Sequence, residues 1–431
     1  MKKFVIKTLG CKTNQVESAL IAEILTNSGY EETKDIQLAT YYILNSCSVT
    51  HVADSKNMSY IKQVKRENPN IKTVLTGCMA QLEKETLLDK KVIDYVIGNY
   101  EKNDIAKILE ADEKVCVSDI FSHDYFRYEK LHQTQRTRAS VKIQDGCNNR
   151  CTYCTIPYAR GKNRSNSIEN VIEQINLFAD EGYYETVLTG IHIGQWGEDF
   201  KEPLKLQNLL EKIEKTNIKR YRLGSLNPLE LTPEFIDFLS KSEKFCPHFH
   251  LSLQSVCDKT LKAMNRRYTQ EDIKNLVNLI NQKFNKAFIG SDIIVGFPNE
   301  TEEDFEITLN NLKELNLTRI HVFPYSRRKG TPADKMSGQI PQEEKKRRVA
   351  LIQEISNKKL EKFFEKNINT ENEVIVEKQR DKKSGLLKGV TNNYINVLID
   401  DTDEYKDKLV KVKLTSLSEY NEKMIAKIVL N

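Results

Sequence analysis

Three of the nine cysteines, Cys147, Cys151 and Cys154, fall within eight residues. Their spacing suits three thiolates that bind three irons of a 4Fe–4S cluster and leave the fourth iron without a protein ligand. An open coordination position indicates chemistry rather than electron storage alone, as it does at a catalytic zinc. The alternatives are zinc, a disulfide pair or small buried hydrophobic residues. Zinc would need a fourth ligand, and the next cysteine or histidine after Cys154 is His192.

The composition is typical of a soluble globular protein, with 39% hydrophobic and 29% charged residues in a chain of 431. A net charge of +5 permits nucleic-acid binding but does not require it. Residues 1–8 lack the apolar core of a signal peptide, and no apolar run reaches membrane-spanning length. We therefore expect a cytoplasmic protein, with no membrane contact, whose reduced cysteines serve metals or chemistry.

Residues 1–121 alternate strand and helix signals, which predicts a doubly wound α/β domain with a parallel sheet. Cys11, Cys47 and Cys78 each follow one of the first three strands. Because the carboxyl ends of parallel strands share one edge, we expect these three cysteines to converge on a second metal site. The alternative is coincidence among buried cysteines, and Cys116, inside an apolar run, is expected to be a core residue. The strands are expected at residues 4–9, 41–45, 72–76 and 92–97.

A polar linker over residues 122–138 precedes a second βα region over residues 139–366. Helix start signals occur at Thr232, Thr269 and Thr301. The βα repeats predict a partial or full (β/α) barrel, with its reactive groups at the carboxyl ends of the strands. The cysteine loop directly follows the first barrel strand. The strands are expected at residues 140–144, 186–189, 220–223, 250–253, 288–295 and 321–324.

Further binding candidates occupy the same rim of the predicted barrel. Small or hydroxyl-bearing residues there allow a nucleoside or an amino acid to approach closely, although turn chemistry and barrel packing are alternatives for each. His192, His250 and His321 are expected to be hydrogen-bonded structural residues rather than catalysts. The candidates for cofactor binding are Gly190, Ser225, Ser252, Gln254, Asp292 and Val295.

A basic helix is expected over residues 342–366, and the pattern then changes to short β-branched strands. These predict a small antiparallel barrel over residues 367–431, a kind of fold that often binds oligonucleotides. Two basic runs, at residues 266–268 and 327–329, are candidates for phosphate contacts or for solvated charge. The barrel strands are expected at residues 373–377, 386–390, 394–399, 409–414 and 425–430.

Several motifs together resemble one family, the radical SAM (S-adenosylmethionine) methylthiotransferases, over essentially the whole chain. They include Gly10-Cys11-Lys12, Asn45-Ser46-Cys47 and Gly77-Cys78-Met79, with further similar stretches at residues 143–161, 250–255, 292–298 and 323–333. Lys12, residues 188–192 and residues 321–329 resemble the MtaB-type branch, which acts on N6-threonylcarbamoyladenosine beside the tRNA anticodon.

The resemblance implies an enzyme that places a methylthio group on carbon 2 of that nucleoside, using two 4Fe–4S clusters and two SAM molecules. It implies that Cys147, Cys151 and Cys154 hold the cluster that cleaves SAM, with Tyr153 beside the cofactor. Cys11, Cys47 and Cys78 would hold the cluster that presents the sulfur. The implied fold adds a TRAM-like C-terminal barrel to the central partial (β/α) barrel.

The implied partners are the tRNA anticodon stem-loop, a flavodoxin- or ferredoxin-type electron donor, and a sulfur source or iron–sulfur assembly proteins. Two nearer alternatives keep the chemistry and change the substrate, to isopentenyladenosine in tRNA or to an aspartate of a ribosomal protein. An alternative from another class is a non-catalytic iron–sulfur protein that binds RNA.

Overall fold

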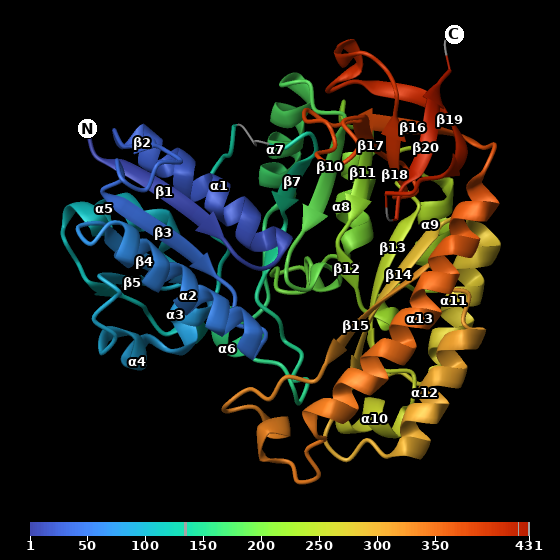
Figure 1. The fold of residues 1–431 in the computed structure, drawn as a ribbon, viewed down its shortest axis with the longest axis horizontal. Helices are drawn as coiled ribbons and strands as arrows, with labels where there is room; N and C mark the ends of the chain where they lie inside the picture. Colours follow the sequence, from blue (N-terminus) through green and yellow to red (C-terminus); the bar gives the residue numbers. More distant parts are fainter. Residues whose placement is uncertain (133–135, 421, 430–431) are drawn as a thin grey trace.

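A computed structural model describes residues 1–132, 136–420 and 422–429. Three β-containing parts follow one another along the chain, and Figure 1 shows them in blue, green to yellow, and red. No helix among the described residues is both long and apolar enough to cross a membrane. The expected order of a doubly wound sheet, a partial barrel and a small closed barrel is confirmed.

The N-terminal part is a six-stranded sheet in the order β2-β1-β3-β4-β5-β6, with every pair parallel. Alternation of strand and helix produces this arrangement, because parallel neighbours need a crossover between them. The strands are β1 (Lys3–Thr8), β2 (Glu31–Glu32), β3 (Tyr41–Ser46), β4 (Lys72–Gly77), β5 (Tyr95–Ile97) and β6 (Val115–Cys116). The helices are α1 (Lys12–Asn27), α2 (His51–Glu67), α3 (Cys78–Leu82), α4 (Lys84–Leu88) and α5 (Ile105–Glu110).

The central part is a partial (β/α) barrel made of two parallel sheets, β11-β10-β7 and β12-β13-β14-β15. Gly224 alone separates β11 from β12, so the two sheets continue one another around the barrel. Among the described residues β7 and β15 do not pair, which leaves the barrel open on that side. The strands are β7 (Ala139–Lys142), β10 (Glu185–Thr189), β11 (Arg220–Leu223), β12 (Ser225–Leu226), β13 (His248–Gln254), β14 (Phe288–Val295) and β15 (Arg319–Pro324).

Helices cover the outside of the partial barrel, and their starts follow the sequence signals. The side chains of Thr232, Thr269 and Thr301 each accept a hydrogen bond from the backbone N–H three residues on. Two of them, Thr269 and Thr301, form complete capping boxes. The helices are α7 (Ile168–Asp180), α8 (Leu206–Ile213), α9 (Pro233–Lys241), α10 (Asp258–Ala263), α11 (Gln270–Lys283) and α12 (Glu302–Glu314).

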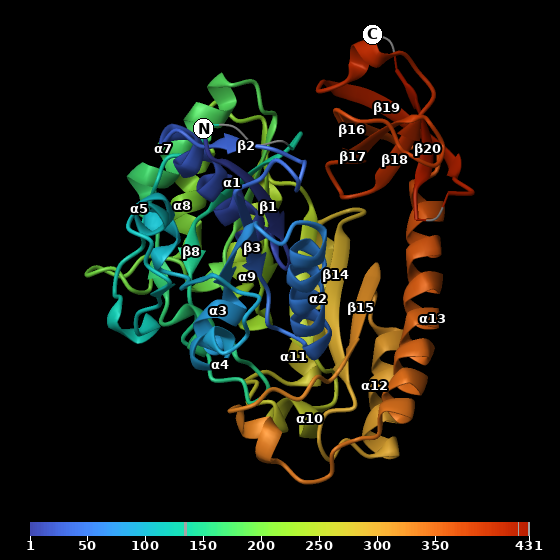
Figure 2. The same cartoon turned by 60° about the vertical axis from the view of Figure 1, so that its left-hand side comes forward.

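The long helix α13 (Gln342–Asn367) runs beside β15 and leads into the C-terminal barrel, as Figure 2 shows. The barrel closes in the order β16-β17-β18-β20-β19. Its pairs are antiparallel except β18 with β20, because a closed ring of five strands cannot alternate direction throughout. The strand expected at residues 425–430 is observed to Ile428, and Leu430 lies outside the described residues. The strands are β16 (Glu371–Val376), β17 (Leu387–Thr391), β18 (Asn396–Ile399), β19 (Leu409–Leu417) and β20 (Met424–Ile428).

The C-terminal barrel contacts the end of the central barrel at which the parallel strands begin. Arg220 and Arg222, at the start of β11, donate hydrogen bonds to the backbone carbonyls of Glu373, Val390 and Thr391. The cysteine loop lies at the opposite end, beyond the carboxyl ends of the strands.

Ser356 fixes α13 to β15 and offers a test of this packing. Its buried hydroxyl accepts a hydrogen bond from the Ile320 N–H and donates one to the Ile320 carbonyl, both at 2.9 Å. Ser356→Ala leaves both backbone groups unsatisfied, which costs roughly 1–3 kcal/mol of local stability. We expect the Ile320 amide to exchange with solvent roughly 10- to 100-fold faster, measured by hydrogen exchange. Asn357→Ala, exposed on the same helix, is the control, and an equal effect of the two variants would contradict this assignment.

Candidate active site

The three N-terminal cysteines gather at one edge of the first sheet. Cys47 directly follows β3 and Cys78 directly follows β4, whose last residues are register partners, and Cys11 follows β1. Burial raises the pKa of Cys47 to about 11, and the neighbouring thiols of Cys78 and Cys11 add to the rise. The register of the strands thus brings Cys47 and Cys78 to one edge of the sheet, where Cys11 follows the neighbouring strand.

Small and polar residues of the same motifs hold the cysteine-bearing loops close together. The Asn14 amide donates to the carbonyls of Leu9 at 2.8 Å and Ser46 at 3.0 Å, which joins the loops before Cys11 and Cys47. Gly10 has φ +110°, and a Cβ there would lie 2.8 Å from the Cys47 Cβ. Only glycine fits this close approach.

The central cysteines lie in the loop between β8 (Gln144–Asp145) and α6 (Ile156–Arg160). Burial, followed by the thiols of Cys151 and Cys147, raises the pKa of Cys154 to about 12. Gly146 has φ +74°, and a Cβ there would lie 1.7 Å from the Lys162 carbonyl oxygen, so the loop needs glycine at this position. The second set of cysteines is thus also mutually close.

Gln144 joins the cysteine loop to the turn that contains Gly190. Its amide nitrogen donates to the Gly146 carbonyl at 2.7 Å, and its amide oxygen accepts from the N–H groups of Ile191 and His192. A Cβ on Gly190 would lie 2.8 Å from the same amide oxygen. Close protein packing thus accounts for glycine at this rim position.

Each central cysteine sulfur has a polar neighbour, at 3.4 to 3.5 Å. The contacts are Cys147 with His192 Nδ1, Cys151 with Arg266 Nη1, and Cys154 with the Ile156 N–H. Hydrogen bonds to cluster sulfurs are one of the means by which a protein sets a cluster's potential. Arg266 belongs to a run that the sequence suggested for phosphate contacts, and the structure turns it toward Cys151 instead.

His192 is held between Cys147 and Glu230. Burial opposes protonation of this imidazole, but the hydrogen bonds to Cys147 and Glu230 outweigh burial and raise the pKa of His192 to about 10. The residue was expected to be structural, and its place beside a cysteine was not evident from sequence. The sequence offered one signal for this contact. His192 follows the second barrel strand, at the rim of the barrel that also carries the cysteine loop.

Most of the remaining rim candidates lie on β12, β13 and β14, and Tyr153 lies in the cysteine loop. Asp292 pairs with His250 at 3.0 Å, and the Ser252 carbonyl accepts from Arg266 at 2.6 Å. Ser225 is exposed and is the register partner of His250. The other three differ in setting: Gln254 has φ +64°, Tyr153 packs against the Met264–Phe297–Tyr325–Ala333 cluster, and the Val295 side chain is buried in the core.

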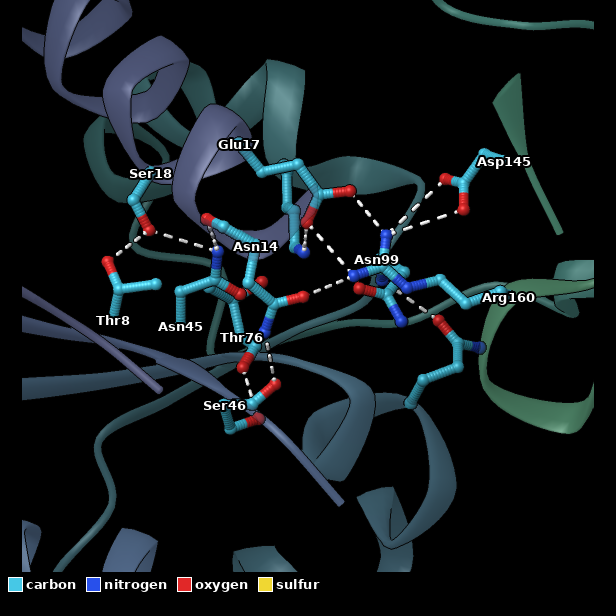
Figure 3. A network of polar contacts seen from close by, with 12 residues as sticks. Thr8, Asn14, Glu17, Ser18, Asn45, Ser46, Thr76, Asn99, Asp145 and Arg160 are labelled. Carbon is cyan, nitrogen blue, oxygen red and sulfur yellow. Dashed lines mark hydrogen bonds and ion pairs between the residues drawn. The ribbon is translucent and has the colours of Figure 1, made fainter. Parts of the chain in front are cut away.

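A buried network of charges connects the two cysteine sites, and Figure 3 shows Arg160 reaching between Glu17 and Asp145. Arg160 also donates to the Asn14 amide oxygen at 2.6 Å. Lys142 contacts both Glu17 and Asp145 at 2.7 Å, and Lys102 pairs with Glu17. Burial alone would raise the pKa of Glu17, but Arg160 and the two lysines hold it well below its usual range. α1 is thereby fixed to the segment that leads into Cys147.

Thiolates are suitable ligands for iron–sulfur clusters, and each cysteine set offers three of them. No three Cys, His, Asp or Glu side chains within residues 1–132, 136–420 and 422–429 are placed to hold a single metal ion. A 4Fe–4S cluster makes a different demand, because each thiolate binds its own iron. Three features of the two sites fit this donor set. The thiols within each site are close to one another, Gly10 and Gly146 directly precede Cys11 and Cys147, and each central sulfur has a polar neighbour.

Two family models match the chain. That of the Radical SAM superfamily matches residues 141–312, and that of an uncharacterized protein family, UPF0004, matches residues 3–98. The chain thus has a radical SAM region preceded by a UPF0004 region. A solved structure of the radical S-adenosylmethionine methyltransferase TsrM from Kitasatospora setae, with cobalamin and a [4Fe-4S] cluster bound, has a TM-score of 0.58 at 14% identity. The match covers 77% of this chain and 74% of that chain and concerns the fold alone.

Relatives of known sequence match nearly end to end. The threonylcarbamoyladenosine tRNA methylthiotransferase MtaB of Aquifex aeolicus (strain VF5) is 38% identical, over 95% of this chain and 99% of its own. The protein of the same name from Bacillus subtilis (strain 168) is 36% identical, over 100% and 97%. The chain therefore belongs to the radical SAM methylthiotransferase family. Its cofactors are 4Fe–4S clusters and SAM.

Glu17→Gln tests the buried network. The change leaves Arg160 and Lys142 with the carboxylate of Asp145 and removes the carboxylate that pairs with Lys102. Breaking a buried pair in this way costs roughly 3–5 kcal/mol. We expect a lower midpoint of thermal unfolding, followed by circular dichroism.

Glu23→Gln is the matched control, on the same helix. Glu23 pairs with the largely exposed His132, a contact worth at most about 1 kcal/mol. Equal shifts of the unfolding midpoint in the two variants would contradict a special role for the Glu17 network.

Proposed function

We propose that this protein methylthiolates carbon 2 of N6-threonylcarbamoyladenosine next to the anticodon of tRNA. The observation that carries the proposal is the pair of three-cysteine sites on elements joined by the Glu17–Arg160 network. The names of the full-length relatives support the choice of nucleoside and of tRNA. An unactivated aromatic C–H is a poor site for polar substitution, which favours radical chemistry at this carbon.

The six cysteines divide the work in this proposal. Cys147, Cys151 and Cys154 would hold a 4Fe–4S cluster, and Cys11, Cys47 and Cys78 a second one. When bound, the two clusters and SAM supply one-electron reduction, hydrogen abstraction, sulfur and a methyl group. The chain's own residues orient these groups, through Gln144 at the central loop and Asn14 at the N-terminal loops. The rim residues Tyr153, Gly190, Ser225, Ser252, Gln254, Asp292 and Val295 are proposed to line the SAM site.

The proposed domain division follows the gaps between the sheets. An α/β domain would span residues 1–121, a linker residues 122–138, the central barrel residues 139–366 and the TRAM-like barrel residues 367–431. In support, β6 ends at Cys116, β7 begins at Ala139 and α13 ends at Asn367. Residues 133–135, 421 and 430–431 of these ranges lie outside the described part of the chain.

The C-terminal barrel is proposed to hold the anticodon stem-loop, so that the target base can be splayed toward the cysteines. A flavodoxin- or ferredoxin-type protein would supply electrons, and a sulfur source or iron–sulfur assembly proteins would restore the second cluster. Cytoplasmic location is part of the same proposal, because tRNA and these partners meet there.

Single cysteine replacements test the division of work. Cys151→Ala is expected to abolish SAM cleavage, whereas Cys47→Ala is expected to retain SAM cleavage and lose methylthiolation. Each variant is expected to bind about four irons per chain where the parent binds about eight, since one cluster of two is lost. Iron analysis and chromatography of the SAM products provide the readouts. Cys116→Ala is the control, and loss of SAM cleavage in Cys47→Ala would refute the division.

Mass spectrometry of tRNA nucleosides, from cells with and without the gene, tests the substrate. Loss of 2-methylthio-N6-threonylcarbamoyladenosine, with accumulation of its precursor, is the expected result. Loss of a methylthiolated isopentenyladenosine would retain the chemistry and change the nucleoside. No change in any tRNA nucleoside would refute action on tRNA and direct attention to ribosomal proteins.

A further inference from the structure

All three parts of the chain contribute to one pocket. Lys12 comes from the first turn of α1, and Tyr394 from the turn between β17 and β18. The central part contributes Arg138, which directly precedes β7, Ser140 of β7 and Val187 of β10. The pocket has a volume of about 520 Å³. That is within the range of small-molecule sites, roughly 300–1,000 Å³. The pocket therefore lies between the C-terminal barrel and Lys12, the residue that directly follows Cys11.

Positive charge dominates the lining of this pocket. One carboxylate, that of Glu377, lines it, and Lys388 neutralises that carboxylate at 3.1 Å. Behind the lining, the buried carboxylate of Glu185 is shared by three arginines: Arg138 of the lining, at 3.8 Å, and the further Arg220 and Arg222. The cationic lining residues are Lys12, Arg136, Arg138, Lys378 and Lys388. Among the described residues, the two carboxylates of Glu377 and Glu185 thus serve Lys388 and three arginines, which leaves neither of them for Lys12 alone.

Lys12 has the clearest need of a counter-ion. Its ammonium group forms no hydrogen bond or ion pair with the described residues. The strongest charges around it are those of Arg138 and Arg222, and they outweigh the opposing carboxylate of Glu185. An ammonium that is largely withdrawn from water beside other cations is costly unless an anion compensates it. Such an arrangement is typical of a site whose ligand brings the negative charge.

Two buried side-chain nitrogen atoms behind the Tyr394 ring also lack hydrogen-bond partners. Arg222 is fully buried and His248 is 5% exposed, yet Arg222 Nη1 and His248 Nδ1 have no hydrogen-bond partner among the described residues. The Tyr394 ring covers both, at 4.9 Å from the guanidinium carbon and 4.1 Å from the imidazole centroid. Tyr394 itself has φ +69°, a strained conformation for a residue with a Cβ. Unpaired buried polar groups and backbone strain together mark functional sites.

We propose that this pocket binds an oxyanion of the RNA substrate, and that Lys12 and Arg138 are the residues that contact it. The proposal rests on the proposed function, and it adds a specificity site to the cysteine centres. Lys12 and Arg138 carry charges on side chains that line the pocket, whereas Arg222 contributes its field from behind Tyr394.

Two oxyanions of the proposed substrate have this chemistry. One is the carboxylate of the threonylcarbamoyl group, which the target base itself carries on N6. The other is a backbone phosphate of the anticodon loop. Contact with the carboxylate would make the pocket a reader of the modification, whereas contact with a phosphate would position the RNA without reading it.

Binding of two anticodon stem-loop RNAs to the cluster-loaded enzyme separates these sources. The RNAs are identical except that the target nucleoside is N6-threonylcarbamoyladenosine in one and adenosine in the other. Kd is measured anaerobically by fluorescence anisotropy, at several salt concentrations, for the parent enzyme and for Lys12→Met and Lys12→Arg. Lys274→Met, an exposed lysine on α11, is the control. Iron content and the thermal unfolding midpoint establish that each variant is folded and loaded.

Lys12→Met is expected to weaken binding of the threonylcarbamoyl RNA roughly 10- to 100-fold, as loss of a hydrogen bond to a charged group does. Lys12→Arg is expected to retain most of the affinity. A loss confined to that RNA assigns the pocket to the carboxylate. An equal loss for both RNAs, with the salt dependence reduced by about one ion, assigns it to a phosphate.

Unchanged affinity of Lys12→Met for both RNAs would overturn the proposal. Failure of the parent enzyme to form a methylthio product on the threonylcarbamoyl RNA would instead contradict the proposed function. Failure of the parent enzyme to bind either RNA would overturn both. The parent enzyme therefore distinguishes the two failures.

Discussion

The relative placement of the two cysteine sites depends on one buried hydrogen bond, from the Arg160 guanidinium to the Asn14 amide oxygen. Asn14 fixes the loops that precede Cys11 and Cys47, and Arg160 ends the short helix that follows the central cysteines. Glu17 strengthens the contact, because the same guanidinium pairs with its carboxylate. In the proposed function the two cysteine sites are reacting centres that need precise relative positions, so a directional contact between them has a clear advantage.

Apolar packing alone would hold α1 on the barrel but would not fix its position along the barrel. Val16 and Ala19 of α1 already pack against the core of the central barrel, and such contacts are non-directional. A network of buried charges opposes sliding, since any shift leaves Arg160 or Lys102 without its carboxylate. The network fixes the geometry of this interface although burying its charges costs desolvation energy. Such an exchange suits the two catalytic centres of the proposed function.

The sequence predicts what depends on local pattern. Strand ends place Cys11, Cys47 and Cys78 at one edge of the sheet, and threonine caps mark the helix starts, as observed. It does not predict contacts between distant residues: 143 positions separate Arg160 from Glu17, and 115 separate Arg266 from Cys151. A charged residue in a motif has many possible partners, and only the folded chain selects one. The sequence also does not predict the parallel pairing of β18 with β20, for another reason. This pairing follows from closure of the five-stranded ring and not from the pattern of any one strand.

α1 brings these features together, because its first turn carries Lys12 and Asn14 and its second turn carries Glu17. The C-terminal barrel contacts one end of the central strands and the cysteine loop lies at the other, and β14, with eight residues, spans roughly 26 Å. In the proposed function, a base held in a stem-loop at the C-terminal barrel would therefore leave its stack to reach the cysteines. In the proposed function its route passes the Lys12 pocket. An anion bound there would act on a helix whose next turn is fixed by Arg160 to the central cysteine loop, so that recognition of the substrate and alignment of the two centres would share one rigid element.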